Sequence, residues 1–251
     1  MKIVVIGGTG LIGSKLVENL SEDGHEALAA SPDTGVNTIT GEGLAEAVQG
    51  ADVVVDVANA PVWEDAAVLD FFLTSTRNTL AAEAAAGVNH HLVLSVVGAD
   101  RLPDSGYLRA KVAQEEAVKA GSVPYSILRA TQFFEFIGRI ADSSSDGEVI
   151  NLSPAFVQPE SAADVAATLA ELAAHEPVNG IVELGGPEKF PLDELARRVL
   201  EAELDERLVR TVVDAPYFGA VLEANSLTPG PNARIAPTRF EDWLNQPAAA
   251  R

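Results

Sequence analysis

A glycine-rich turn near the start of the chain constrains the fold more than any other feature. The apolar run 3–6 leads into Gly7-Gly8-Thr9-Gly10-Leu11-Ile12-Gly13, and the amphipathic stretch 14–22 follows. In a strand–turn–helix unit of this kind, the first glycine makes the turn, the second lets the backbone approach a pyrophosphate, and the third allows close helix packing. The sequence therefore predicts a dinucleotide site at the helix start, where free N–H groups attract phosphate.

Short β-branched runs alternate with alanine-rich helical stretches through the first half of the chain. The run 53–57 places apolar residues at consecutive positions, which indicates a strand buried on both faces of a parallel sheet. This alternation predicts an α/β fold with a doubly wound parallel sheet, the Rossmann arrangement. The predicted strands are 3–6, 27–30, 53–57, 92–97 and 125–128, and the predicted helices are 14–22, 43–49, 64–86 and 108–120.

The second half of the chain is less regular, although it contains no linker of low complexity. We expect a single NAD(P)-binding domain over residues 1–251, in which residues from about 142 onward form a small C-terminal α+β region that contributes much of the substrate site. Strands are predicted at 155–157 and 180–184. Helices are predicted from Ser161 or Asp164, at 193–204 and at 240–244.

Composition excludes several kinds of function. The net charge of −20 disfavours binding to nucleic acid or to anionic lipid. There are no cysteines, so thiolate catalysis and zinc–thiolate sites are excluded, and we expect no metal. Neither a signal peptide nor an apolar stretch of membrane-spanning length is visible, so we expect a cytoplasmic protein with a small-molecule substrate. The oligomeric state is left open.

The spacing Gly-x-x-Gly-x-x-Gly with Thr9 inside it resembles the atypical short-chain dehydrogenase/reductases, and NmrA-like NAD(P)-binding proteins in particular. The resemblance extends over nearly the whole chain and is strongest before about Asp142. It implies that Ala58 and Asn59 pass beneath the cofactor and that residues 130–132 cradle the nicotinamide. Further segments that carry it are 55–59, 76–80, 128–133 and the corner Gly185-Gly186-Pro187.

Three residues form the candidate catalytic set. Ser95 follows Leu92-Val93-Leu94 within the predicted strand 92–97. Tyr107 comes twelve residues later and forms a Tyr-x-x-x-Lys pattern with Lys111. Positions four apart share a helix face, and a nearby ammonium lowers the pKa of a phenol. In the resembling family, Ser polarises the carbonyl, Tyr transfers the proton and Lys also binds the nicotinamide ribose. The resemblance assigns these roles to Ser95, Tyr107 and Lys111, and some relatives that reduce alkenes use mainly the Lys.

The end of the second predicted strand bears on the choice of dinucleotide. An acid there would bind the ribose of NAD, whereas a basic residue would accommodate the 2′-phosphate of NADP. The family's usual Arg is missing, and Pro32 is expected to turn Asp33 out of the strand. Ser31 could donate to a phosphate, with help from Lys15, so the sequence favours NADP, with NAD as the alternative.

The function predicted from these features is an NAD(P)H-dependent oxidoreductase that reduces a carbonyl or an activated double bond of a small apolar molecule. A non-catalytic NmrA-like regulator that senses dinucleotides and a nucleotide-sugar epimerase or dehydratase are the alternatives. His90 and His91 precede the strand 92–97, at the end opposite the usual active-site edge of the sheet, and we expect them on the surface. The predicted cofactor-binding residues are Gly7, Thr9, Gly10, Leu11, Ile12, Gly13, Ser31, Ala58, Asn59, Lys111, Ala130, Thr131 and Gln132.

Overall fold

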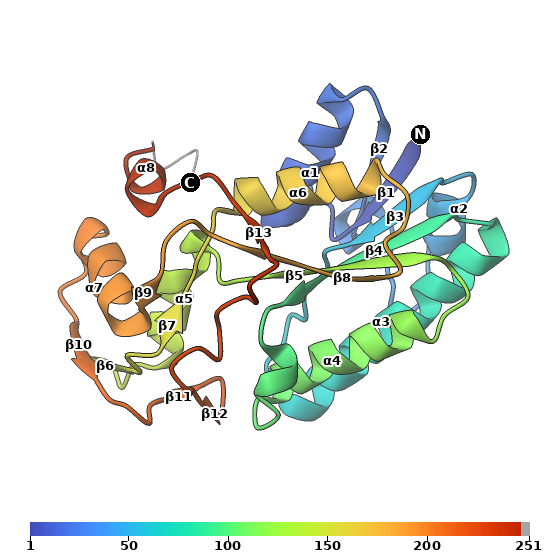
Figure 1. The fold of residues 1–251 in the computed structure, drawn as a ribbon. Coiled ribbons are helices and arrows are strands. Elements are labelled where there is room, and N and C mark those ends of the chain that lie inside the picture. Colours follow the sequence, from blue (N-terminus) through green and yellow to red (C-terminus); the bar gives the residue numbers. More distant parts are fainter. Residues whose placement is uncertain (247–251) are drawn as a thin grey trace. The chain divides into compact units, whose positions relative to one another are not determined.

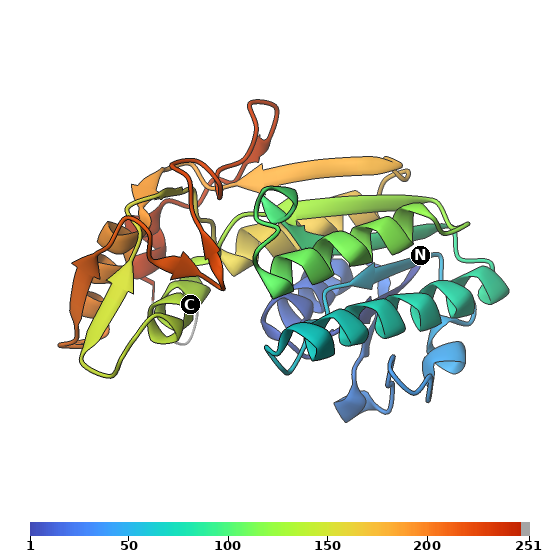
Figure 2. The ribbon, with the colours of Figure 1, turned by 90° about the horizontal axis from the view of Figure 1, so that it is seen from below.

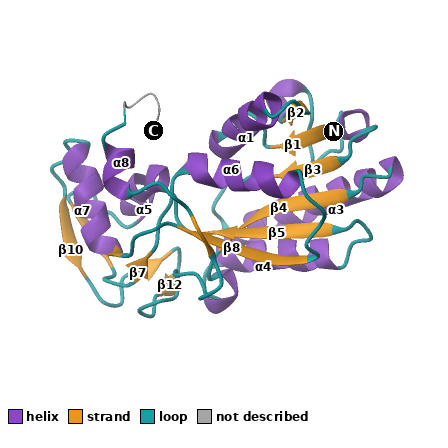
Figure 3. Ribbon diagram, turned by 45° about the horizontal axis from the view of Figure 1, so that its top comes forward, coloured by secondary structure: helices purple, strands orange, loops and turns teal. Residues whose placement is uncertain are grey.

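A computed structural model of the protein describes residues 1–246. Its central feature is a seven-stranded parallel sheet with the strand order β13-β8-β5-β4-β3-β1-β2 (Figure 3). This order, which reverses direction at β1, confirms the predicted doubly wound fold. The strands are β1 (Lys2–Ile6), β2 (Glu26–Ala30), β3 (Val53–Asp56), β4 (His90–Val96), β5 (Tyr125–Ala130), β8 (Gly180–Gly185) and β13 (Arg234–Ile235).

Helices cover both faces of the sheet. α1 (Leu11–Glu22) and α6 (Ala162–Ala173) lie on one face, and α3 (Asp65–Ala86) and α4 (Gly106–Lys119) lie side by side on the other (Figures 1 and 2). The short helix α2 (Leu44–Val48) packs against α3. Every residue of β3 is buried, as expected for a strand covered on both faces.

The chain divides into two compact units. The first comprises Met1–Ser95, Ala110–Arg129 and Val165–Val182. Its core lies between the strands and the flanking helices, and one part of it brings Val4, Ile6 and Val54 of the sheet against Leu44 and Val48 of α2. Burial of branched aliphatic side chains of this kind contributes about 1.5–3 kcal/mol each to folding.

The second unit comprises Val96–Arg109, Ala130–Asp164 and the chain from Glu183 onward. Small sheets dominate it: β6 pairs in parallel with β10, β7 antiparallel with β9, and β11 antiparallel with β12. Its further elements are α5 (Ile137–Ser143), β6 (Val149–Leu152), β7 (Phe156–Val157), β9 (Phe190–Pro191), α7 (Leu192–Ala202), β10 (Leu208–Thr211), β11 (Pro216–Tyr217), β12 (Ala220–Val221) and α8 (Phe240–Leu244). Single 3-10 turns form at Pro32–Thr34, Ala99–Arg101 and Phe134–Phe136.

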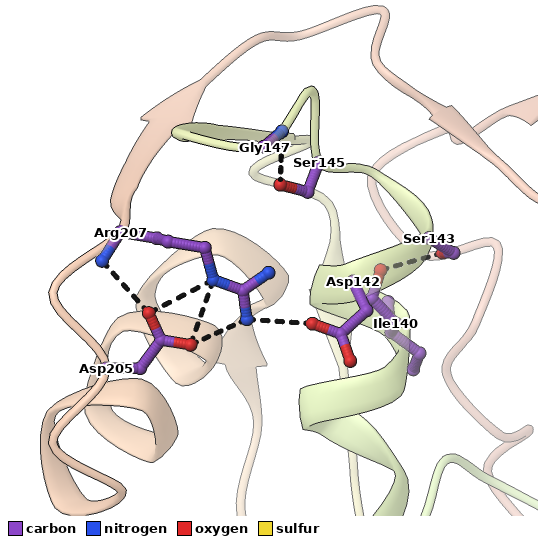
Figure 4. A network of polar contacts seen from close by, with 7 residues as sticks. All are labelled: Ile140, Asp142, Ser143, Ser145, Gly147, Asp205 and Arg207. Carbon is purple, nitrogen blue, oxygen red and sulfur yellow. Dashed lines mark hydrogen bonds and ion pairs between the residues drawn. The ribbon is translucent and has the colours of Figure 1, made fainter.

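An ion-pair cluster in the second unit ties α5 to the segment that follows α7. The Arg207 guanidinium donates to Asp142 at 2.7 Å and to both Asp205 oxygens at 2.6–3.0 Å (Figure 4). The Asp142 side chain is largely exposed, and the Arg207 side chain is partly so. Exposed pairs of this kind contribute about 0–1 kcal/mol each, so the cluster serves to order the two segments more than to stabilise the fold.

The structure differs from the sequence-based expectations in the position of two histidines. His90 and His91 belong to β4, which begins two residues earlier than expected, and both are buried rather than on the surface. The expected surface location is wrong because each imidazole has a polar partner inside the first unit: His90 Nε2 bonds Ser126 Oγ at 2.9 Å, and His91 Nδ1 bonds Glu83 Oε1 at 2.8 Å. Within residues 1–246, no helix combines the length and apolarity that a bilayer span requires.

Candidate active site

The glycine turn joins β1 to α1 and forms a backbone cradle. Gly7 has a φ of +78°, a conformation that favours glycine. A Cβ at Gly13 would lie 2.2 Å from the Gly7 carbonyl oxygen, so the helix can pack this closely only without a side chain. A Cβ at Gly10, by contrast, would make one tight contact, 3.3 Å from the Gly7 carbonyl oxygen, and would otherwise face open space. Packing within the protein therefore explains Gly13 but leaves the space beside Gly10 open for a ligand.

The start of α1 carries the exposed donors of this cradle. Gly10 is the N-cap in an extended conformation, and no side chain caps the helix. The first N–H groups of a helix have no partner within it and attract anions. Thr9, Gly10 and Leu11 are exposed, whereas Ile12 and Gly13 are buried. A pyrophosphate fits here on the open side of Gly10, against the N–H groups of the first turn.

The end of β3 lies directly beside the turn. A Cβ at Gly7 would lie 2.9 Å from the Ala58 backbone, so the glycine turn and the segment after β3 pass each other at close range. The Ala58 N–H donates to Asp56 Oδ1 at 3.0 Å, and the Ala60 N–H donates to Asn59 Oδ1 at 3.0 Å. These bonds order the segment that the resemblance places beneath the cofactor.

The end of β2 contributes a buried hydroxyl. Ser31 Oγ has no hydrogen-bond partner among the described residues, while the Ser31 N–H donates to Thr34 Oγ1 at 2.9 Å. Asp33 is exposed in the 3-10 turn that follows. The next loop is fixed by α3, since Asn78 Nδ2 donates to the carbonyl oxygens of Thr38 and Ile39 at 2.7 and 3.1 Å.

Lys111 is buried in the first unit, with 3% of its surface exposed. Its Nζ donates to the Leu94 carbonyl oxygen at 2.8 Å and to Gln114 Oε1, and it lies 4.4 Å from the centre of the Phe72 ring. Burial lowers the pKa of Lys111 to about 8, although the negative charges of Asp56 and Glu115 oppose this. The ammonium is thus held by neutral acceptors in a site that disfavours its charge.

Ser95 is engaged with a buried ion pair of the same unit. Its Oγ donates to Glu115 Oε1 at 2.7 Å, and Arg129 contacts both Glu115 oxygens at 2.8 and 2.7 Å. Ser95 is 2% exposed. To polarise a substrate carbonyl, its hydroxyl would have to give up this carboxylate.

Tyr107 lies in the first turn of α4 and is half-buried. Burial raises the pKa of Tyr107 to about 12, so the lowering expected from a nearby ammonium is not found in the protein alone. Tyr107 and Tyr217 of β11 both belong to the second unit. Burial also raises the pKa of Tyr217, and the contact of Tyr217 with Gln132 partly offsets this rise. At neutral pH both phenols are therefore protonated and are proton donors.

The segment after β5 is fixed by a buried carboxyl group. The Thr131 N–H donates to Glu160 Oε1 at 2.9 Å, and the Thr131 hydroxyl donates to the Gln158 carbonyl oxygen at 2.7 Å and lies 3.1 Å from Glu160 Oε1. Burial raises the pKa of Glu160 to about 8 despite these bonds. Ala130, Thr131 and Gln132 are all buried.

Several polar residues of this region were not predicted from the sequence. Asp56 and Gln114 support Lys111, Glu115 holds Ser95 and Arg129, and Glu160 holds Thr131. For Asp56, Gln114 and Glu115, the signal was a charged or amide side chain inside an otherwise apolar strand or on a helix that faces the sheet. Asp56 within the run 53–57 is the clearest example.

Comparisons with known proteins agree with this geometry. A family model described as NAD(P)H-binding matches residues 7–176. The divinyl chlorophyllide a 8-vinyl-reductase of Oryza sativa subsp. indica is 28% identical over 224 residues, covering 74% of this chain and 55% of the rice protein. The photosystem II assembly factor Ycf39 of Cyanophora paradoxa is 24% identical over 165 residues, covering 60% of this chain and 51% of that protein. The chain thus spans about half the length of these curated relatives.

Among solved structures, a short-chain dehydrogenase/reductase superfamily protein from Agrobacterium tumefaciens with bound NAD superposes with a TM-score of 0.73. The match covers 100% of this chain and 97% of that one at 18% identity, which shows a common fold. The family match begins at Gly7 and includes the whole glycine turn, β3 and Lys111. The chain belongs to the NAD(P)H-binding family.

Proposed function

We propose that this protein is an NAD(P)H-dependent oxidoreductase that reduces a carbonyl or an activated double bond of a small, rather apolar molecule. The observation that carries the proposal is the buried Lys111 ammonium, which is held by two carbonyl oxygens and no carboxylate. Burying a cation without a direct counter-ion is costly, and such sites are characteristic of function. The name of the rice relative, a reductase, supports the same chemistry.

The residues divide the work as follows. When bound, the dinucleotide supplies the hydride. The α1 N-terminus and Gly10 hold the pyrophosphate, and Lys111 donates to the nicotinamide ribose. Tyr107, four residues before Lys111 on α4, donates a proton to the oxygen or carbon that becomes basic on reduction. A phenol with a pKa of about 12 is protonated at neutral pH, which suits the reductive direction.

Ser95 takes a different place in this proposal from the one that the resemblance implies. Its proton is directed to Glu115, and it is nearly inaccessible. We therefore assign proton transfer to Tyr107 and Lys111 and leave Ser95 to order Glu115 and Arg129. We propose that the second unit, which includes the segments that begin at Ala130 and at Glu183, supplies the substrate region.

The choice of dinucleotide rests on the end of β2. The unpartnered Ser31 hydroxyl supports NADP(H), because it could donate to a 2′-phosphate. NAD(H) is the second candidate, because residues 26–43 contain Glu26, Asp33 and Glu42 but no Lys or Arg.

A second function has one specific observation in its favour. The engagement of Ser95 and the name of the Ycf39 relative, an assembly factor, support a protein that binds NAD(P) and turns nothing over. The two are separated by oxidation of NADPH and NADH with a panel of quinones, enones and aldehydes. Turnover that is lost in Tyr107→Phe and Lys111→Met, but kept in the control variants Tyr125→Phe and Lys189→Met, supports the reductase. Tight binding without any turnover across the panel supports the non-catalytic alternative.

A further inference from the structure

Asp56 ends β3 as a buried carboxylate, and no cation among residues 1–246 bonds directly to it. Its Oδ1 accepts from the Ala58 N–H at 3.0 Å and its Oδ2 accepts from Gln114 Nε2 at 3.2 Å, and it is 1% exposed. A fully buried charge is stable only when it is paired or well hydrogen-bonded. The structure gives Asp56 two neutral donors, and one of them, Gln114, leads on to Lys111.

Asp56 determines which way the Gln114 amide points. A carboxylate only accepts hydrogen bonds, so Gln114 must present its NH₂ group to Asp56. The amide oxygen then faces the other way and accepts from Lys111 Nζ. Asp56, Gln114 and Lys111 therefore form a hydrogen-bonded chain. The Asp56 carboxylate sets the orientation of the Gln114 amide, and the amide oxygen in turn sets the orientation of the Lys111 ammonium.

Among the described residues, these hydrogen bonds leave one N–H of the Lys111 ammonium without an acceptor. An ammonium has three N–H donors, and the Leu94 carbonyl oxygen and Gln114 Oε1 take two of them. The Phe72 ring, 4.4 Å from Nζ, adds a cation–π contact from α3. With two bonds and one ring contact fixed, the third N–H has a single direction.

The other charged groups on this face do not replace Asp56. Glu115 on α4 is already neutralised by Arg129 of β5, and Glu83 of α3 binds His91 of β4. Lys119, further along α4, pairs with Glu116. The negative charge of Asp56 is thus not neutralised by another described cation and acts on Lys111. The Gln114 amide lies between the Asp56 carboxylate and the Lys111 ammonium.

We propose that Asp56 and Gln114 are positioning residues that orient the Lys111 ammonium and preserve its charge, so that its remaining N–H is directed to the ribose of the bound dinucleotide. The proposal rests on the proposed function in naming the ribose as the ligand group. The orientation of Lys111 itself does not depend on it. A direct Asp–Lys pair would occupy the third N–H, whereas the intervening amide leaves it available.

The state of Lys111 can be measured directly, because the chain has only five lysines. In full-length protein labelled with ¹³C at lysine Cε, NMR follows each ammonium through its titration, and Lys111→Met identifies the Lys111 signal. We expect the Lys111 pKa to fall by about one unit in Asp56→Asn, since a nearby negative charge is lost. Gln114→Glu, which places a carboxylate directly on Lys111, should raise it. Lys119 and Lys189 serve as internal controls and should not move.

Cofactor affinity supplies the second readout. Asp56→Asn and the isosteric Gln114→Met should each weaken binding of NADPH or NADH about tenfold at pH 7, which is the effect of losing one charge-assisted hydrogen bond. Gln114→Glu keeps an oxygen on Lys111 and should recover part of the affinity. Thermal melting shows whether each variant is folded. If one variant does not fold, the other variants still test the hydrogen bonds that join Asp56, Gln114 and Lys111.

The two proposals fail in different ways. If the wild-type protein binds neither dinucleotide, the proposed function is overturned, while the Lys111 titration still tests its orientation. If the wild-type protein binds a dinucleotide, but Asp56→Asn and Gln114→Met leave both the Lys111 pKa and the affinity unchanged, the positioning role is overturned.

Discussion

The hydroxyl of Ser95 donates a 2.7 Å hydrogen bond to Glu115, a carboxylate that also binds Arg129 through both of its oxygens. This contact turns the serine of a familiar catalytic pattern toward the interior of the first unit. Because the proton of Ser95 is committed there, we predict that Ser95→Ala lowers turnover less than about fivefold, whereas Tyr107→Phe lowers it by about 10²-fold or more. Steady-state rates with one accepted substrate check this. A loss in Ser95→Ala as large as that in Tyr107→Phe would return Ser95 to the catalytic set.

The glycine turn gives a pair of variants that separate folding from binding. In Gly13→Ala, the new Cβ would lie 2.2 Å from the Gly7 carbonyl oxygen, so we expect a marked loss of thermal stability. In Gly10→Ala, the one tight contact, 3.3 Å from the Gly7 carbonyl oxygen, is relieved by a shift of a few tenths of an ångström, so the fold should survive while dinucleotide binding weakens. Thermal melting followed by fluorescence titration measures both. Wild-type affinity in Gly10→Ala would show that no phosphate approaches the backbone there.

The pH dependence of cofactor affinity follows from Lys111. With a pKa of about 8, Lys111 is charged below that pH and loses its charge above it. The dissociation constant for NADPH or NADH should therefore rise as pH increases through about 8. Lys111→Arg keeps its charge throughout this range and should show a flat profile, even if its affinity is lower. A wild-type profile that stays flat from pH 7 to pH 9.5 would contradict the role of Lys111.

The pair of Glu83 and His91 should be important for stability. Both side chains are fully buried, and their 2.8 Å contact is the only polar partner of each among the described residues. Burial opposes the charge on His91, but Glu83 outweighs it and raises the pKa of the imidazole. Glu83→Ala would leave His91 unpaired and should cost about 3–5 kcal/mol. Glu83→Gln, which keeps a hydrogen bond, should cost less. Urea unfolding measures both, and equal costs would argue against the ionic contribution.

Glu160 predicts how stability changes with pH. Burial raises its folded-state pKa from the ordinary 4.5 to about 8. Its contribution is therefore fully present below pH 4.5 and is lost as pH rises toward 8, because the unfolded chain ionises first. Glu160→Gln keeps an oxygen for Thr131 and has no charge to acquire. Relative to wild type, it should gain stability between pH 5 and pH 8. The free energies of unfolding of wild type and Glu160→Gln, measured at pH 5 and pH 8, test this. If the difference between the two proteins is the same at both pH values, Glu160 lies in a more polar environment and its pKa is not raised.

The sequence was sufficient for the parts of the fold that depend on local pattern. Strand 27–30 and helix 64–86 were predicted within about one residue of β2 and α3, since hydrophobic periodicity and flanking glycines mark such elements. The strands of the second unit were largely missed. β6 and β10 are four residues long and pair with each other across 59 positions, Val149 with Leu208, which no local window reveals.

The candidate site divides in the same way. The backbone cradle was predictable, because glycine spacing encodes backbone geometry directly. The partners of the side chains were not: Gln114 meets Asp56 across 58 positions, and Glu160 meets Thr131 across 29. Such contacts depend on the register of strands and helices. For the same reason, the family resemblance placed Ser95 in the catalytic set without showing that Glu115 lies against it.

The most direct test of this account is titration of the purified protein with NADPH and NADH in parallel, monitored by cofactor fluorescence, with Gly10→Ala and Lys111→Met alongside. We expect micromolar binding of at least one dinucleotide, weakened in both variants while their melting temperatures remain near that of the wild type. Failure of the folded wild-type protein to bind either dinucleotide would contradict it.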